Sequence, residues 1–298
     1  MDFKLLKDQM KENNESYINC DENNWTSKYV IFADLIGFKN RCQRSNDATV
    51  NNIHRYRRAI SKALDGLAIK KFLFTDACYV LTSEPKVALL AASNIQNECL
   101  LHNIIQLEHV DNPLFHHMII PKIVISKGDV LCSEKDPNLL AGSGIVNAYN
   151  LEKYTTGGLI SCDQCCINDL KKPEPVNEKT ELFSLYRSWK HNKIEPQKNS
   201  FFFHDDVFDI PWIALQSRLS VKGEVKLESI ESLRIKIKSF KKIWEMSFSE
   251  HIVERTPTQT LKHFAGAMSH LCDFVQLYKK TGKIRWDMNK LSNEIDSI

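Results

Sequence analysis

Apolar residues along the chain follow two different spacings, and the changes between them predict the order of the elements. The stretch "YVIFADLIGFKNR", residues 29–41, opens with a continuous apolar run of the kind that forms a buried strand. Over residues 39–67 the apolar side chains then recur every three or four positions, which predicts a helix with one apolar stripe. The members of that stripe are Ile53, Tyr56, Ile60, Leu64 and Leu67.

The next segments alternate between strand and helix patterns. In "AIKKFLFTDACYVLTSE" two β-rich halves meet at Thr75-Asp76, which predicts a hairpin. A second long helix is expected after Pro85, and "HHMIIPKIVISKG" predicts a strand that ends at Gly128. "AGSGIVNAYNLEKY" predicts a glycine-containing turn and a helix, and "GGLISC" a short strand. "TELFSLYR" and "SFFFHDDVFDIPWIAL" show weaker strand patterns.

This order of elements predicts an α+β domain with one sheet and helices packed on one face. From about Lys222 the pattern turns helical, and "VKLESIESLRIKIKSFKKIWEMSF" and "TPTQTLKHFAGAMSHLCDFVQLYKKTG" predict two helices. We therefore divide the chain into a polar N-terminal segment (1–24), a mixed domain (25–215) and a helical extension (216–298).

Composition narrows the class of protein. The chain has 298 residues, 43% of them hydrophobic and 26% charged, as in an ordinary globular protein. A net charge of +3 on this length gives no reason to expect DNA, RNA or an anionic membrane as a partner. No signal peptide and no apolar run of about eighteen residues is found, so we expect no membrane span. The nine cysteines are scattered and odd in number, which favours reduced thiols and a cytoplasmic protein.

One cysteine cluster, "SCDQCC", could suggest a metal site. It contains Cys162, Cys165 and Cys166, but a second ligand pair at the spacing of a zinc finger is missing. We therefore interpret these cysteines as small buried or half-buried residues at the start of a helix.

Two carboxylates stand where predicted strands stop. Asp34 follows "YVIFA" and Asp76 lies in the hairpin after "KKFLFT". Taken singly, each could cap a helix or accept hydrogen bonds from its own turn. If the two strands are neighbours in one sheet, however, the carboxylates converge, and two like charges brought together are unfavourable unless a cation lies between them. Two Mg²⁺ or Mn²⁺ ions, which share their coordination with substrate phosphates, would supply that charge.

The motifs in this order resemble the class III nucleotidyl cyclases. "FADLIGF" resembles their opening motif F-x-D-I-x-G-F, and "FTDACYV" resembles their second metal-binding hairpin. "VISKGDV" and "AGSGIVNAYNLEKY" resemble the strand, turn and helix with the "G-x-x-V-x-x-A…LE" signature. The resemblance covers about residues 25–165, with a weaker continuation to 215. It implies a cyclase domain with a ferredoxin-like βαββαβ core that works as a head-to-tail homodimer, with active sites between the protomers.

The chain departs from the purine cyclases of this family at three positions. Phe72 stands at about the place of the lysine that reads the purine, while Val146 and Asn150 stand where an asparagine and an arginine assist the transition state. "GSGIVNAYNLE" is similar to the motif "G-x-x-x-x-x-A-Y-x-L-E" of the bacterial pyrimidine cyclases in Pycsar antiphage systems. This resemblance implies a cyclase that makes cyclic UMP or cyclic CMP, with UTP favoured over CTP, and a product that activates a separate effector protein.

The resemblance also implies roles for individual residues. Two metal ions would be held by Asp34, Asp76 and the main-chain carbonyl of Leu35, while the ribose 3′ hydroxyl attacks the α-phosphorus and pyrophosphate leaves. The amides of Ile36, Gly37 and Phe38 would bind phosphate oxygens, with Gly37 allowing the tight turn.

For other side chains near these motifs, the sequence allows both a substrate-binding and a structural role. Arg41, with Lys39 and Arg44, could compensate phosphate charge or lie on a solvated helix face. Phe72 and Tyr79 could form walls of the base pocket or pack in the core.

Two other functions stay open from the sequence. The same fold could be a catalytically silent module for dimerisation or nucleotide sensing, or the chain could be a purine (ATP or GTP) cyclase. Retention of both Asp34 and Asp76 argues against the silent module, because a retired site has no physical need for two converging carboxylates. The helical extension could brace a dimer or sense infection.

Overall fold

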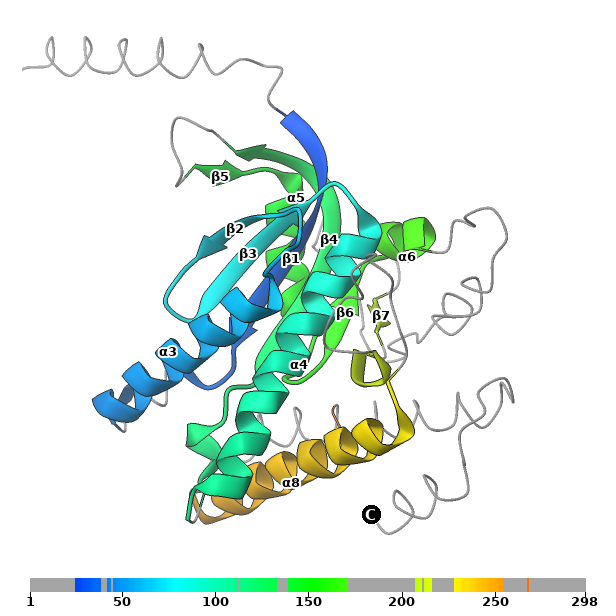
Figure 1. Cartoon of the computed structure of the whole chain (residues 1–298). Helices are drawn as coiled ribbons and strands as arrows, with labels where there is room; N and C mark the ends of the chain where they lie inside the picture. The colour runs from blue at the N-terminus through cyan, green and yellow to red at the C-terminus, as the bar shows by residue number, and fades with distance from the viewer. Residues whose placement is uncertain are drawn as a thin grey trace, which may run out of the picture.

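The computed structural model describes residues 25–38, 42–43, 45–111, 113–132, 139–170, 207–210, 212–215, 228–254 and 267 (Figure 1). Its strands are β1 (Trp25–Leu35), β2 (Lys70–Leu73), β3 (Ala77–Thr82), β4 (Pro121–Cys132), β5 (Leu140–Ala141), β6 (Ile160–Cys162) and β7 (Phe208–Asp209). Its α-helices are α3 (Asn46–Ala63), α4 (Pro85–His109), α5 (Ser143–Glu152), α6 (Gln164–Leu170) and α8 (Ile230–Glu254). Two short 3-10 helices are η2 (Phe115–His117) and η3 (Trp212–Ala214).

The strands form one seven-stranded sheet in the order β2-β3-β1-β4-β6-β7, with β5 paired to β4. β1 lies between β3 and β4 and is antiparallel to both. With α3 joining β1 to β2 and α4 joining β3 to β4, this is the βαββαβ arrangement of a ferredoxin-like core. β6 adds to β4 in parallel, after the crossover through α5. The predicted α+β fold class is therefore confirmed.

The helices cover both faces of the sheet. Successive residues of a strand point to opposite faces, and in β1 Ile31 and Ala33 belong to the large core cluster under α3 and α4. Phe32 belongs instead to a second cluster, which includes Ala148 and Leu151 of α5. α5 therefore lies on the opposite face from α3 and α4, and the expectation of helices on one face is wrong. A central strand buried on both sides shows only a continuous apolar run, so its sequence does not say how many faces are covered.

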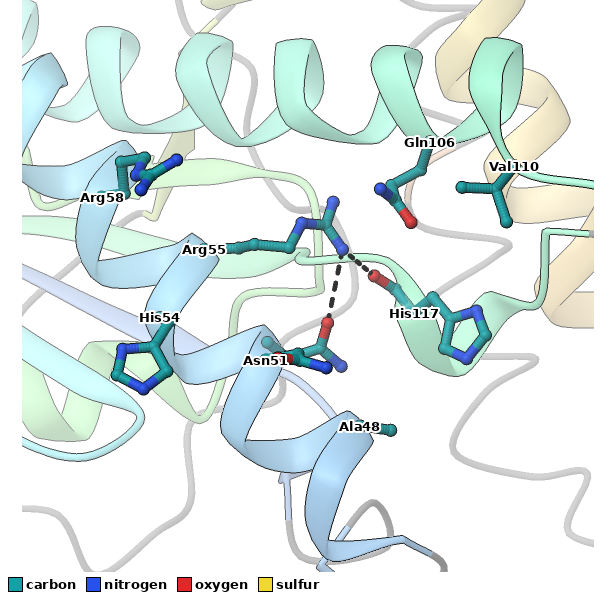
Figure 2. A pocket seen from close by; sticks show the side chains of 9 residues that line it. Ala48, Asn51, His54, Arg55, Arg58, Gln106, Val110 and His117 are labelled. Atoms are coloured by element: carbon teal, nitrogen blue, oxygen red, sulfur yellow. Dashed lines mark hydrogen bonds between the residues drawn. The ribbon is translucent and has the colours of Figure 1, made fainter.

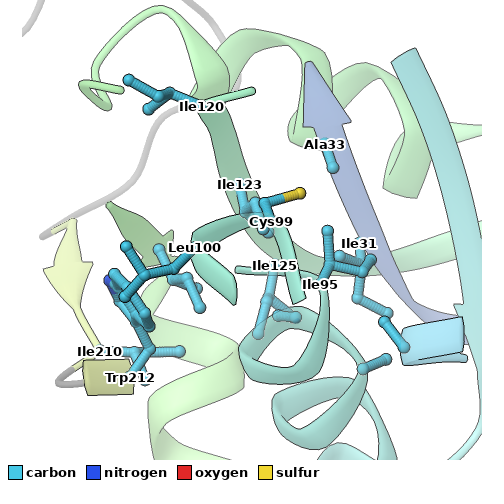
Figure 3. Close-up of a cluster of buried hydrophobic side chains, with 14 of the residues drawn as sticks. Ile31, Ala33, Ile95, Cys99, Leu100, Ile120, Ile123, Ile125, Ile210 and Trp212 are labelled. Carbon is cyan, nitrogen blue, oxygen red and sulfur yellow. The ribbon is translucent and has the colours of Figure 1, made fainter. Parts of the chain in front are cut away.

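The larger core joins the sheet to segments from the C-terminal part of the chain (Figure 3). Ile123 and Ile125 of β4 meet Ile95 and Cys99 of α4 there. Trp212 of η3 is buried at the edge of this cluster.

The indole Nε1 of Trp212 donates a hydrogen bond to the Gly158 carbonyl at 2.9 Å. The Phe240 ring of α8 packs against Trp212 with 5.8 Å between ring centroids, and Trp244 of α8 is also fully buried. α8, which we assigned to the helical extension, thus packs on the same core as the sheet.

Most of the predicted elements are present, with shifted bounds. β1 begins at Trp25, and the long helix after Pro85 is α4. Within the predicted helix 39–67, α3 begins after Ser45, whose hydroxyl accepts a hydrogen bond from the Ala48 amide. β4 begins at Pro121 and continues past Gly128 to Cys132.

The strand expected in "TELFSLYR" lies outside the described residues. The helix expected after Thr256-Pro257 is described only at Ala267, which is helical and buried in the larger core. Within the described ranges, none of the helices combines the length and the apolar character that a bilayer crossing requires.

Candidate active site

The sheet brings Asp34 and Asp76 to one end of two neighbouring strands. In the β1–β3 register Asp34 lies opposite Ala77, the residue that follows Asp76. The Leu35 amide donates a hydrogen bond to the Asp76 carbonyl at 2.9 Å, which ties the hairpin turn to the end of β1. The two carboxylates therefore share one rim of the sheet, as the sequence predicts for adjacent strands.

Asp34 lies in an environment that disfavours its charge. It shares a face of β1 with Phe32, on the α5 side of the sheet, and is only partly exposed. Burial raises the pKa of Asp34 to about 7, and the neighbouring carboxylates of Glu152 and Asp76 contribute to the shift while Lys122 opposes it. Without an added cation, the charged form of Asp34 is therefore disfavoured relative to a carboxylate in water.

Two of these neighbours, Glu152 and Lys122, were not predicted as site residues. Glu152 ends α5, and Lys122 lies opposite Asp34 in the β1–β4 register. The Lys122 ammonium donates to the Glu152 carboxylate in a half-buried ion pair. Glu152 could have been found from the sequence, because it belongs to the Leu-Glu pair that closes the α5 motif. No sequence feature identifies Lys122, because only the register of β1 and β4 places it beside Asp34.

The donor set fits a divalent cation in part. Among the described residues, no group of three or more histidine, cysteine or acidic side chains is arranged to hold a metal ion. Asp34 and Asp76 supply two carboxylates, and the pKa of Asp34 is raised first by burial and then by the neighbouring Glu152 and Asp76 carboxylates, so a cation bound there would be favourable. A hard divalent ion bound there would take further ligands from backbone carbonyls, water and substrate phosphates. Asp34, Asp76 and the Leu35 carbonyl remain the residues that we predict to hold it.

The turn after Asp34 agrees with only part of the predicted phosphate site. Gly37 has a φ of 71°, a left-handed conformation that favours glycine. The Ile36 amide donates to the Ile120 carbonyl at 3.0 Å, so it extends the β1–β4 ladder and cannot point at a phosphate. The prediction for Ile36 is corrected accordingly, and the amides of Gly37 and Phe38 remain candidates. Arg41, Lys39 and Arg44 lie outside the described residues.

A row of four aromatic rings runs along the α5 side of the sheet, next to Asp34. Tyr79 stacks on Phe32 with ring centroids 4.6 Å apart, and Phe74 meets Tyr79 edge-on at 6.0 Å. Tyr149 of α5 lies 6.4 Å from Phe32 at the other end of the row. Phe74 and Tyr149 are each about half exposed, at 51% and 52%. These rings could contact a nucleobase or another protein surface.

The remaining predicted residues lie nearby or in the core. Phe72 is buried in the smaller core cluster, so the core-packing interpretation holds for it. Val146 is an exposed residue of α5, and Asn150 accepts a hydrogen bond from Lys153. The cysteines Cys162, Cys165 and Cys166 are free thiols; the first and third are buried and the second is exposed.

No protein-family model matches the chain, and no curated protein matches it. Among solved structures, the chain is similar to the guanylyl cyclase Cya2 with a TM-score of 0.46 and 18% identity, over 63% of this chain and 92% of that chain. The dimeric guanylyl cyclase domain of the RhoGC fusion protein from the aquatic fungus Blastocladiella emersonii gives 0.41 and 16%, over 49% and 85%. The adenylyl cyclase CyaB from P. aeruginosa gives 0.40 and 16%, over 49% and 81%. Similarities of this degree carry no information about activity or substrate.

Proposed function

We propose that this protein is a nucleotidyl cyclase that converts a pyrimidine nucleoside triphosphate, UTP in preference to CTP, into the 3′,5′-cyclic monophosphate and pyrophosphate. The observation that carries the proposal is the pairing of Asp34 and Asp76 at one rim of the sheet, where the pKa of Asp34 is raised to about 7. A partly buried carboxylate pair at a strand end is unfavourable for the fold by itself and becomes favourable where it binds a cation.

In this mechanism the protein binds and orients the reactants. Asp34, Asp76 and the Leu35 carbonyl would hold Mg²⁺ or Mn²⁺, two per site, and the amides of Gly37 and Phe38 would bind the triphosphate. When bound, the metal would supply Lewis-acid chemistry that favours loss of the ribose 3′ hydroxyl proton and departure of pyrophosphate. Lys122 keeps the Glu152 carboxylate paired, so that this third negative charge does not face the phosphates uncompensated.

Two features support a pyrimidine substrate. The residue at the place of the purine-reading lysine is Phe72, whose buried side chain offers no hydrogen bond to a base. The motif "GSGIVNAYNLE" resembles that of the pyrimidine cyclases in antiphage systems. The proposal therefore includes a signalling role in which the cyclic nucleotide activates a separate effector protein during phage infection.

A homodimer completes the proposal. Phe74, Tyr149 and Val146 are each close to half exposed, although they lie on the face that carries Asp34. A second protomer on this face would cover these side chains and close the site against water. It could also supply the phosphate-binding groups that Val146 and Asn150 do not provide.

The test is an incubation of the purified protein with Mn²⁺ and each of the four ribonucleoside triphosphates, followed by measurement of pyrophosphate and of cyclic nucleotide. We expect turnover of one pyrimidine triphosphate, and none by the Asp34→Asn variant. Turnover of ATP or GTP alone would instead identify a purine cyclase.

A second candidate function is a silent nucleotide-sensing module. The observation in its favour is that Val146 and Asn150 occupy the places of the usual transition-state groups. It predicts saturable binding of a nucleoside triphosphate without turnover, even after addition of phage lysate.

A further inference from the structure

A large cavity opens on the other side of the sheet, between the first turns of α3, the C-terminal end of α4 and the 3-10 helix η2 (Figure 2). Its volume is about 780 Å³, which is within the range of roughly 300–1,000 Å³ typical of small-molecule sites. Because α3 and α4 cover the face opposite to α5, this cavity is separate from the rim that holds Asp34. Its lining residues are Ala48, Asn51, Asn52, His54, Arg55, Arg58, Gln106, Val110 and His117.

The lining is cationic and contains no acidic side chain. Arg55 and Arg58 both extend from α3 toward α4 (Figure 2), and His54 and His117 add two imidazoles. The acidic side chain of Glu98, on the facing part of α4, is already paired with Lys62 at 2.9 Å. The positive charge in the cavity is therefore not neutralised by its own walls.

Arg55 is the best-fixed of these cations. Its Nη1 donates to the His117 carbonyl at 2.6 Å and to the Asn52 side chain at 3.5 Å, and its Nη2 donates to the His102 carbonyl at 3.1 Å. All three acceptors are neutral, and burial lowers the pKa of the Arg55 guanidinium. The Arg55 guanidinium is half-buried and has no ion-pair partner among the described residues. Charged side chains with this degree of burial are usually paired with an opposite charge.

Two other side chains of the cavity, Arg58 and His54, have donors to spare. Arg58 and His54 are exposed, and neither forms a hydrogen bond or an ion pair with another described residue. Two amide side chains, Asn51 and Gln106, lie on opposite walls. Guanidinium groups bind phosphate through pairs of parallel hydrogen bonds, so two arginines at one cavity favour a phosphate-bearing ligand.

We propose that this cavity is a binding site for a small phosphate-bearing anion, with Arg55 as the fixed cation and Arg58 as a second, exposed one. One of its walls is the segment that precedes β4. Asn52 donates to the His116 carbonyl at 2.7 Å, and the same segment ends at Ile120, whose carbonyl accepts the Ile36 amide. The site therefore lies against the backbone that positions the turn after Asp34.

The proposal is tested by calorimetric titration of the full chain with inorganic phosphate, in EDTA and without nucleotide, so that the result does not depend on catalysis. Chloride at matched ionic strength corrects for screening. We expect saturable binding at one phosphate per chain, weakened about tenfold in Arg58→Gln, because a hydrogen bond to a charged group is lost. Arg58 is exposed, so this variant keeps the fold, whereas Arg55 anchors backbone carbonyls and is left intact.

Arg57→Gln is the matched control. Arg57 is the neighbouring exposed arginine of α3, but it is not a lining residue and donates instead to the Phe74 carbonyl at 3.0 Å. The Arg57→Gln variant loses the same charge as Arg58→Gln, and we expect it to bind phosphate with the affinity of the unchanged protein. An equal loss in both variants would mean general attraction by net charge and would overturn the proposal, as would the absence of saturable binding.

Two further titrations identify the source of the phosphate group. Tighter binding of UMP than of phosphate, with the same dependence on Arg58, would indicate a nucleotide ligand. Equal affinities would indicate that the phosphate group alone is recognised. Citrate that binds more tightly than phosphate would contradict a phosphate site.

Discussion

Lys122 of β4 forms an ion pair with Glu152 at the end of α5, and this pair lies beside Asp34. The two partners act on Asp34 in opposite directions. Glu152 raises the pKa of Asp34 and Lys122 lowers it, with burial as the larger cause of the net increase to about 7. Side chains from two other elements thus adjust the charge on the proposed metal-binding carboxylate, in addition to the larger effect of burial.

We predict that variants of the two partners shift the stability of the metal-free protein in opposite directions. The pKa of Asp34 is raised in the folded state from 3.8 to about 7, so the folded protein binds more protons than the unfolded chain between these values. The free energy of unfolding therefore falls as the pH rises from about 4 to about 7, and this loss is complete above pH 7. Glu152→Gln should reduce the loss, and Lys122→Gln should increase it.

The measurement is urea unfolding in EDTA at a series of pH values from 4 to 8. Lys242→Gln serves as the control, because Lys242 is an exposed lysine of α8 that is not among the charged groups acting on Asp34. Parallel pH profiles for all three variants would contradict the coupling of Asp34 to the pair.

Removal of either proposed metal-binding carboxylate should abolish activity without unfolding the protein. Asp34→Asn or Asp34→Ala should abolish pyrophosphate release, yet raise the free energy of unfolding of the metal-free protein at pH 8 by ~2 kcal/mol, because a buried charge is removed. Asp76→Ala should also abolish turnover while leaving the protein folded. Thermal unfolding with and without Mn²⁺ provides the measurement, and Mn²⁺ should stabilise only the unchanged protein. Loss of folding in both variants would mean that the carboxylates are structural.

The close approach of β4 and α5 should be sensitive to a single methyl group. A Cβ added at Gly128 would lie 2.5 Å from the Gly144 backbone nitrogen, which is too close for a real contact. Gly128→Ala should therefore push α5 from the sheet and lower the free energy of unfolding by about 2 kcal/mol. Val146→Ala, at an exposed position of α5, should change it by less than about 0.5 kcal/mol. A stable Gly128→Ala variant would contradict this packing.

Charge on the exposed aromatic row should prevent dimer formation. Tyr149→Glu places a carboxylate on the surface that we propose to be covered by a second protomer, and we expect a monomer with no cyclase activity. Light scattering after size-exclusion chromatography measures the mass. Ile235→Glu is the control, since Ile235 is equally exposed, at 54%, but lies on α8. A Tyr149→Glu variant that remains a dimer would place the interface elsewhere.

The sequence by itself determined the order of the elements and the position of two acidic residues at strand ends. Periodicity acts over a few residues, so the stripe that includes Tyr56 and Ile60, the hairpin at Asp76 and the turn at Gly37 could all be predicted locally. The convergence of Asp34 and Asp76 was also predictable. Elements that follow one another in the sequence are usually neighbours in space, so the first strand and the hairpin were expected to pair in one sheet.

Only the tertiary structure decided which groups meet from distant parts of the chain. The β1–β4 register places Lys122 beside Asp34, and a shift of one residue would have turned the Lys122 side chain to the other face. The same pairing occupies the Ile36 amide. The covering of the second face by α5 brings Glu152 to the same place. Likewise, Arg55 finds neutral acceptors instead of a carboxylate because α3, α4 and η2 pack together there. Such contacts depend on the packing of whole elements, which no local pattern encodes.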